Sequence, residues 1–160
     1  MSQFRTGFGY DVHQLVHNRP LIVGGVQIPH SKGALGHSDA DALLHAIADA
    51  LLGAAALGDI GQLFPDTEPT FKNIKSTEIL KAVFNMISNK GFTISNIDST
   101  IVLQEPKIIS YIPEMRACIA ETLNLDIDQV SVKATTTEHL GFIGAGEGIA
   151  AYASVLIISK

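Results

Sequence analysis

The stretch HSDADALLH, residues 37–45, decides how the chain can fold. Ser38 is a good N-cap residue, and Asp41 follows it three positions later in a capping-box arrangement. We therefore expect a helix to begin at Ser38, to run to about Leu57 and to stop at Gly58, a residue type that commonly ends helices. This stretch predicts a helix that anchors the elements around it.

Two faces of this helix differ in character. Asp41, His45 and Asp49 recur every four residues and so share one face. The other face is apolar and is expected to pack in the core; it carries Leu44, Ile47, Leu51 and Leu52. Asp41 and Asp49 each lie one turn from His45, where they either orient its imidazole or only solvate the helix.

A candidate metal site follows when this helix is combined with an upstream strand. Asp11 and His13 are two residues apart in an expected strand over residues 4–13, so their side chains project from one face. Together with His45 they supply one carboxylate and two imidazoles. Catalytic Zn²⁺ sites use such sets with one position left open, and non-haem Fe(II) oxygenases use the same ligands. The alternative is that each histidine is an ordinary core or solvated residue.

Two further stretches are candidates for phosphate binding. His37 precedes the expected helix, whose first amides attract anions, and Ser38 either contacts such an anion or only caps. Thr135, Thr136 and Thr137 end an expected strand with Glu138, an oxygen ligand suited to Mg²⁺. The alternative is a β-forming threonine run that ends in a surface glutamate.

Strand and helix patterns alternate along the chain. We expect strands at 4–13, 21–23, 26–28, 93–104, 130–134 and 149–158, helices at 38–57, 76–91 and 113–124, and loops at 30–37, 59–70 and 141–148. The last strand is nearly continuously apolar and is expected to be buried on both faces. This order predicts an α/β (α+β) sandwich, in which a mixed β-sheet carries helices mainly on one face.

Composition excludes several classes. The 160 residues suit a single domain over residues 1–160, and the 46% hydrophobic content favours an oligomer. A net charge of −5 argues against nucleic acid as a partner. The single Cys118 fits a reducing compartment, and neither a signal peptide nor a membrane-spanning run is visible, so we expect a cytoplasmic protein. No Ser-His-Asp or Cys-His set stands out, so an enzyme of this sequence would use a nucleophile from its substrate.

Several motifs match one family in order. They are GYDVH at 9–13, HSDAD at 37–41, LLGAAALGDIG at 51–61, LFPDT at 63–67 and KATTTE at 133–138. In these motifs the chain resembles the 2-C-methyl-D-erythritol 2,4-cyclodiphosphate synthases of the non-mevalonate isoprenoid pathway. The match extends over nearly the whole chain.

The resemblance implies a reaction and an assembly. The expected substrate is 4-diphosphocytidyl-2-C-methyl-D-erythritol 2-phosphate, and the products are the cyclic diphosphate and CMP. The expected enzyme is a phosphorus-oxygen lyase that acts by metal-assisted intramolecular phosphoryl transfer. It would be a homotrimer whose active sites lie between neighbouring subunits, without a nucleic-acid or membrane partner.

The resemblance also implies roles for single residues. Asp11, His13 and His45 would bind Zn²⁺, and Glu138 would help to bind Mg²⁺ or Mn²⁺. His37 and Thr136 would stabilise the transition state. The residues implied to contact the substrate are Ser38, Asp59, Ile60, Gly61, Phe64, Pro65, Asp66, Thr67, Glu68, Leu103, Gln104, Glu105, Pro106, Lys107, Ile108, Ile109, Thr135, Thr137 and Phe142.

One departure from the family pattern and two rival functions stay open. Ala145 stands where the family usually has a basic residue, so anion binding in a central trimer cavity is in doubt. His17, His30 and His139 have no role that the sequence suggests. The rivals are an Fe(II) oxygenase and a metal- or nucleotide-binding module that does not turn over.

Overall fold

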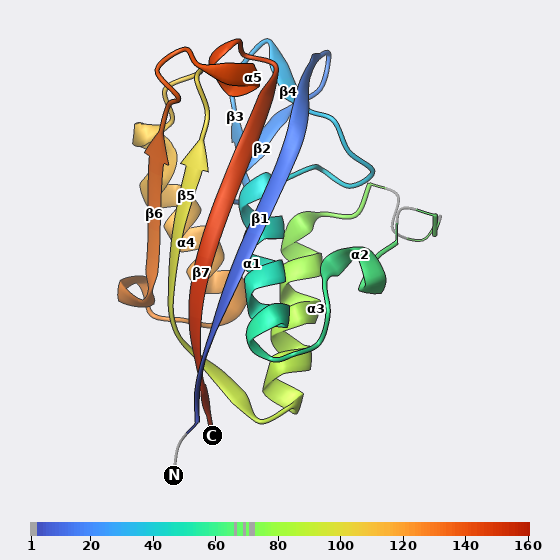
Figure 1. Cartoon of the computed structure of the whole chain (residues 1–160), viewed down its shortest axis with the longest axis vertical. Helices are drawn as coiled ribbons and strands as arrows, with labels where there is room; N and C mark the ends of the chain where they lie inside the picture. The colour runs from blue at the N-terminus through green and yellow to red at the C-terminus, as the bar shows by residue number, and fades with distance from the viewer. Residues whose placement is uncertain (1–2, 66, 69, 71–72) are drawn as a thin grey trace.

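A five-stranded mixed sheet that carries its helices on one face forms the frame of the protein (Figure 1). The structure is a computed structural model that describes residues 3–65, 67–68, 70 and 73–160. Its strands are β1 (Phe4–His17), β2 (Leu21–Val23), β3 (Val26–Ile28), β4 (Lys32–Ala34), β5 (Phe92–Val102), β6 (Val130–Thr135) and β7 (Gly148–Ser159). Its helices are α1 (Ala42–Ala54), α2 (Ile60–Leu63), α3 (Ser76–Asn89), α4 (Ile112–Leu123) and α5 (Gly141–Gly144), with single 3₁₀ turns η2 (Ile109–Tyr111) and η3 (Ile127–Gln129).

The strand order confirms the predicted mixed sheet. The order is β4-β1-β7-β5-β6, and β2 and β3 form a separate hairpin. All neighbours in the large sheet are antiparallel except β5 and β6, which are parallel. Because β5 and β6 run the same way, their carboxyl ends meet at one end of the sheet, where Val102 pairs with Thr135.

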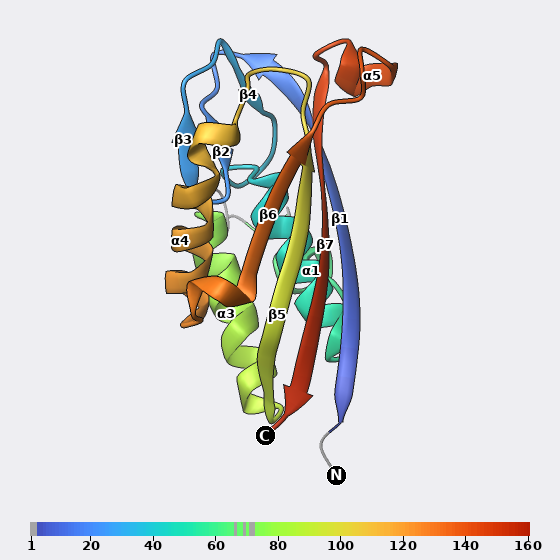
Figure 2. The same ribbon diagram turned by 90° about the vertical axis from the view of Figure 1, so that its left-hand side faces the viewer.

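The prediction that the helices lie mainly on one face is also confirmed. Figure 2 shows α1, α3 and α4 on one side of the sheet, while the other side carries no helix along most of its length. The apolar stripe of α3 packs as its helical spacing predicts; its buried members include Ile79, Leu80, Val83 and Ile87. In α4, Met115, Ile119 and Leu123 are buried in the same way.

Two glycines of β1 let α1 lie directly on the sheet. A Cβ atom at Gly9 would stand 1.9 Å from the carbonyl oxygen of Ala46, and one at Gly7 would stand 1.9 Å from that of Ala50. No side chain larger than hydrogen fits at such an approach. This close contact sets His45 of α1 beside Asp11 and His13, which follow Gly9 in β1.

The first helix differs from its prediction at both ends. It begins at Ala42, and its N-cap is Asp41, whose side chain accepts from the amide of Leu44. Ser38 is therefore not the cap. The helix ends at Ala54, three residues before the predicted Leu57. Nearly every residue of α1 is buried, because the sheet covers one side and α3 the other.

Other boundaries also depart from the sequence pattern. The expected loop at 30–37 contains the short edge strand β4, and the glycine-rich turn at 141–148 contains the single-turn helix α5. Ser76, an expected cap, is the first residue of α3, and Lys75 stands at the cap position. In β7 of the single chain, Tyr152 is exposed, so within one subunit the prediction that this strand is buried on both faces is wrong.

The helix-free face of the sheet is rich in exposed aromatic side chains. Phe8, Tyr10 and Tyr152 are 68%, 44% and 40% exposed in the single chain. The ring centroids of Tyr10 and Tyr152 lie 5.0 Å apart, and those of Phe8 and Tyr152 lie 6.2 Å apart. An apolar patch of this kind is typical of a surface that is covered in an assembly. Among the described residues, no helix combines the length and apolarity that crossing a bilayer requires.

Candidate metal centre and substrate site

Asp11, His13 and His45 converge on one point, as the sequence predicts. Oδ2 of Asp11 lies 2.8 Å from Nε2 of His13 and 3.1 Å from Nδ1 of His45, and the two nitrogens are 3.3 Å apart. One donor atom from each residue therefore falls within 4.8 Å of the other two. Among the described residues, this is the cluster of histidine, cysteine and carboxylate side chains whose spacing suits a metal ion.

The hydrogen bond of His13 to the backbone leaves Nε2, the other ring nitrogen, facing the cluster. Nδ1 of His13 lies 2.9 Å from the carbonyl oxygen of Leu35. A carbonyl only accepts, so Nδ1 is the protonated nitrogen of a neutral His13 ring. In this neutral form the lone pair of Nε2 points at Asp11 and His45, whereas in the protonated form Nε2–H donates to Oδ2 of Asp11. A cation placed among these atoms relieves the contact between lone pairs, so the donor set fits a metal such as Zn²⁺.

Contact between Asp11 and the two histidines shifts the pKa values of Asp11 and His13 toward their charged forms. Burial alone would raise the pKa of Asp11, but hydrogen bonds and the attraction of His13 and His45 outweigh it and bring that pKa below its usual value. Burial would lower the pKa of His13, yet the contact with Asp11 raises it above its usual value. The carboxylate of Asp11 is thus ionised and available as a ligand under neutral conditions.

A pocket of about 340 Å³ opens in front of these ligands. Besides the three ligands, it is lined by five of the residues predicted for substrate or transition state: His37, Ser38, Ile60, Gly61 and Phe64. Nε2 of His37 is buried and has no hydrogen-bond partner among the described residues. A buried polar atom without a protein partner at a pocket wall is free to bond to a ligand or to water.

The segment after α1 forms one wall of this pocket. Asp59 caps the short helix α2 by accepting from the amide of Gln62, and it is not a lining residue. Asp49 accepts from the amide of Ile60 at 2.8 Å and so anchors the same segment. Burial raises the pKa of Asp49. Of the predicted contacts that follow, Pro65, Thr67 and Glu68 continue this segment, and Asp66 lies outside the described residues.

The predicted orienting role of Asp41 and Asp49 is not supported by their contacts. The fully buried carboxylate of Asp41 accepts from the amides of Gly24 at 2.9 Å, Gly25 at 2.7 Å and Leu44 at 3.1 Å. Burial raises its pKa to about 6, while these hydrogen bonds oppose the rise. Neither carboxylate has a described hydrogen bond to the His45 ring. Asp41 instead ties the β2–β3 turn to the start of α1.

The remaining predicted residues gather elsewhere, at the carboxyl ends of β5 and β6. The amide of Leu103 donates to the carbonyl of Thr135 at 3.0 Å, and that of His139 donates to Oε1 of Gln104 at 3.1 Å. Thr136 donates to Oε1 of Glu138 at 3.2 Å. This second group, which we call the strand-end group, consists of Leu103, Gln104, Glu105, Pro106, Lys107, Ile108, Ile109, Thr135, Thr136, Thr137 and Glu138.

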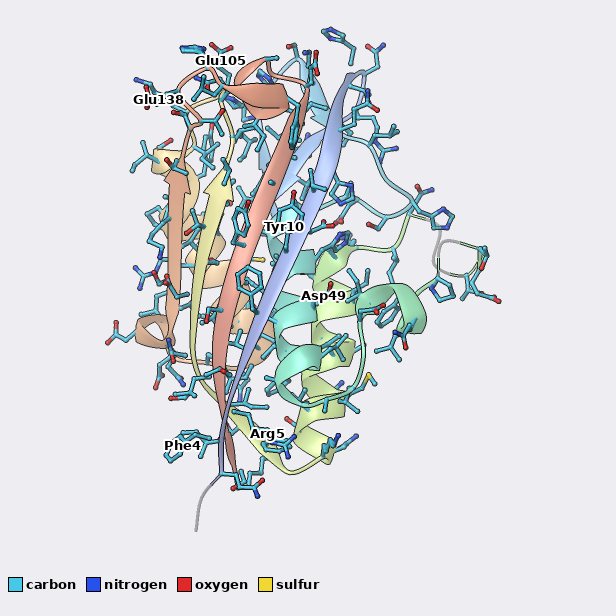
Figure 3. All side chains as sticks on the ribbon, viewed as in Figure 1. Phe4, Arg5, Tyr10, Asp49, Glu105 and Glu138 are labelled. Carbon is cyan, nitrogen blue, oxygen red and sulfur yellow. The ribbon has the colours of Figure 1, made fainter. Side chains whose placement is uncertain are left out.

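The strand-end group does not meet the metal cluster within one chain. In Figure 3, Glu105 and Glu138 lie together at one end of the sheet, away from Tyr10 and Asp49. Glu138 is also absent from the cluster of metal-binding side chains among the described residues. Phe142 of α5 lines a pocket with Val12 and His13. One chain therefore presents two separate halves of the predicted site.

Comparison with known proteins identifies the family of the chain. The YgbB family model matches residues 4–158. The 2-C-methyl-D-erythritol 2,4-cyclodiphosphate synthase of Alkaliphilus oremlandii is 62% identical over 154 residues, which cover 96% of this chain and 98% of that protein.

Solved structures share the fold. The bifunctional IspDF of Campylobacter jejuni superposes with a TM-score of 0.96 at 47% identity, covering all of this chain and 43% of that one. The IspF of Plasmodium falciparum in complex with CDP gives a TM-score of 0.86 at 36% identity, covering 98% and 97% of the two chains. Motifs, fold and full-length similarity agree, and the chain belongs to the YgbB family of 2-C-methyl-D-erythritol 2,4-cyclodiphosphate synthases.

Proposed function

We propose that the chain carries out the cyclisation for which its relatives are named, at the pocket in front of Asp11, His13 and His45. The reaction converts 4-diphosphocytidyl-2-C-methyl-D-erythritol 2-phosphate to 2-C-methyl-D-erythritol 2,4-cyclodiphosphate and CMP. An oxygen of the 2-phosphate forms a bond to the β-phosphorus, and the bond from that phosphorus to CMP breaks. The observation that carries the proposal is the convergence of the three ligands on a pocket that His37 and Ser38 also line.

The attacking group explains why no catalytic triad is needed. A phosphate oxygen is already anionic at neutral pH, so no base has to remove a proton from it. The barrier lies in bringing two anions together and in orienting them in line. A pocket that holds both ends of one substrate supplies this proximity, which is worth up to roughly 7–11 kcal/mol in ideal cases.

Asp11, His13 and His45 would hold Zn²⁺ through Oδ2, Nε2 and Nδ1. When bound, Zn²⁺ supplies positive charge that neutralises and orients phosphate oxygens. Membership of this family favours zinc-assisted phosphoryl transfer over the Fe(II) oxygenase that the same ligand set allows. His37 would donate its unpartnered Nε2–H to a phosphate oxygen as charge develops, and Ser38, Ile60, Gly61 and Phe64 would hold the methylerythritol end.

The strand-end group would bind the cytidine end. The CDP complex of a relative supports a cytidine nucleotide as the ligand class. Thr136 would contact the diphosphate as a transition-state donor, and Glu138 would bind Mg²⁺ or Mn²⁺, which typically take one or two carboxylates together with substrate phosphates. Residues 103–109 with Thr135, Thr137 and Phe142 would surround the nucleoside.

A homotrimer would join the two halves. Within one chain the strand-end group stands apart from the metal cluster, and the aromatic face of the sheet is exposed. Packing these faces together would cover Phe8, Tyr10 and Tyr152 and set the strand-end group of one subunit against the metal cluster of the next. We propose that residues 1–160 act as one catalytic domain in such a trimer, and that the protein works in the cytoplasm.

Phosphorus NMR tests the proposed reaction. The purified protein, supplied with Zn²⁺ and Mg²⁺, is incubated with the cytidyl substrate. The expected result is loss of the substrate's diphosphate signals with the appearance of CMP and a cyclic diphosphate. Binding of CMP without a cyclic product would indicate a nucleotide-binding module and would overturn the proposal.

A further inference from the structure

The side of the His45 ring that faces away from the metal cluster is held by two serines and an aspartate. Nε2 of His45 lies 2.8 Å from Oγ of Ser76 and 3.3 Å from Oγ of Ser38. Ser76 is 1% exposed, and its hydroxyl also contacts Oδ1 of Asp39. A continuous row of contacts therefore runs from Asp39 through Ser76 and His45 to the metal cluster.

The chemistry of these groups fixes the position of each proton. An ionised carboxylate only accepts, so the hydroxyl of Ser76 donates its one proton to Asp39. Oγ of Ser76 can then only accept from the ring, and Nε2 of His45 must be the protonated nitrogen of a neutral imidazole. In the neutral ring, which is the form that binds a metal, Nδ1 is left with its lone pair, and Nδ1 is the atom that faces Asp11 and His13.

Backbone contacts keep this row rigid. The amide of Ser76 donates to Oδ2 of Asp39 at 3.1 Å, which satisfies the start of α3 where Lys75 provides no side-chain cap. The amide of Asn73 donates to the carbonyl of His37 at 2.9 Å, and the amide of Asp39 donates to the carbonyl of Ile74 at 3.3 Å. The 37–39 segment and the start of α3 are thus fixed to each other beside the metal cluster.

We propose that Asp39 and Ser76 are positioning residues that set the tautomer and the orientation of His45, and thereby the affinity of the site for Zn²⁺. The inference rests on the zinc site proposed above and goes beyond it by naming residues that touch neither metal nor substrate. Partners of metal-bound histidines typically change metal affinity 10–100-fold when they are removed. Ser38 is the less well placed of the two serines, since its Oγ is 3.3 Å from the ring and also accepts from the amide of Ala40.

Zinc affinity tests the proposal without reference to turnover. Zn²⁺ is titrated into the metal-free protein in competition with a chromophoric chelator. We expect Ser76→Ala to weaken binding by about 10–100-fold. Asp39→Asn should weaken it less but still by more than twofold, because an asparagine oxygen can accept from Ser76 but carries less negative charge than a carboxylate. The matched control is Ser99→Ala, which removes another buried hydroxyl, 2% exposed, that donates to the carbonyl of Ser131 at 2.9 Å on the sheet.

The tautomer itself is a second readout. Long-range ¹H–¹⁵N spectra of the metal-free protein, recorded at a pH where the His45 ring is neutral, should show its proton on Nε2, and Ser76→Ala should reduce this preference. Zinc affinity of Ser76→Ala and Asp39→Asn within twofold of the unaltered chain would overturn the inference, as would an equal loss in Ser99→Ala. If Ser76→Ala does not fold, Asp39→Asn decides. An unaltered chain with no affinity for Zn²⁺ would instead overturn the metal site on which the inference rests.

Discussion

Nε2 of His13 and Nδ1 of His45 lie 3.3 Å apart, and both face the same oxygen of Asp11. One nitrogen comes from a strand and the other from a helix, and each ring is fixed from behind by a hydrogen bond. The site is therefore built on rigid elements, which is the arrangement that precise metal geometry requires.

Replacing a ligand should abolish both metal binding and turnover. We expect His45→Ala to lose bound Zn²⁺ and to release no CMP, because two ligands do not hold the ion against solvent. Elemental analysis of the dialysed protein and a CMP assay measure the two effects. His17→Ala, which removes an exposed histidine at the end of β1, should keep both. A zinc-free but fully active His45→Ala protein would refute the ligand assignment.

Two glycine substitutions should have opposite effects on stability. Gly9→Ala forces a methyl group against the carbonyl of Ala46 and should lower the free energy of unfolding by several kcal/mol. Gly53 lies in α1 with no atom within 4 Å of a new Cβ, so Gly53→Ala should raise that free energy by about 0.5–1 kcal/mol. Urea unfolding of both variants checks this. Equal effects would show that α1 does not rest on β1 as described.

Asp41 should act on stability rather than on zinc binding. Asp41→Asn keeps one acceptor oxygen and replaces the other by an NH₂ group. In one orientation this NH₂ group faces the N–H of Gly25, and in the other it faces the N–H groups of Gly24 and Leu44. An unsatisfied buried donor costs about 1–3 kcal/mol. We expect a lower urea midpoint for this variant and a zinc affinity close to that of the unaltered chain. A large zinc defect in a stably folded variant would restore the orienting role that the sequence suggested.

The aromatic face should control assembly. Phe8→Glu places a charge on the surface that a trimer would cover, so we expect sedimentation to show dissociated subunits. Ile127→Glu, at an exposed apolar residue of η3, should leave a particle three times the mass of the 17.0 kDa chain. A trimer that survives Phe8→Glu would mean that subunits associate through another surface.

Much of the fold could be predicted from the sequence because its signals are local. The apolar spacing of α3 and α4, the Gly24-Gly25 hairpin and the alternation in β6 each follow from short-range pattern. The start of α1 was less predictable. Ser38 and Asp41 both suit an N-cap, and the choice depends on the amides of the β2–β3 turn, which lie 16 and 17 residues away from Asp41.

The metal ligands of the candidate site could be predicted from the sequence, but the residues that hold those ligands in place could not. Asp11, His13 and His45 have spacings that place them on one strand face and one helix. Ser76 carries no such signal, because a serine before an apolar helix has the pattern of a cap. Its contact with His45 joins residues 31 apart and exists only after α3 packs beside α1. The separation of the strand-end group from the metal cluster likewise depends on how the chain folds in space.

Complementation between two inactive variants shows whether one active site is built from two subunits. In the proposed trimer the zinc ligands of one subunit lie opposite Glu138 of its neighbour, so His45→Ala and Glu138→Ala should each be inactive alone. Refolded together in equal amounts, they should form trimers in which about one quarter of the sites combine an intact half from each chain. Phosphorus NMR should then show cyclic diphosphate at about that fraction of the activity of the unaltered protein. A mixed sample as inactive as either variant alone would contradict the shared site.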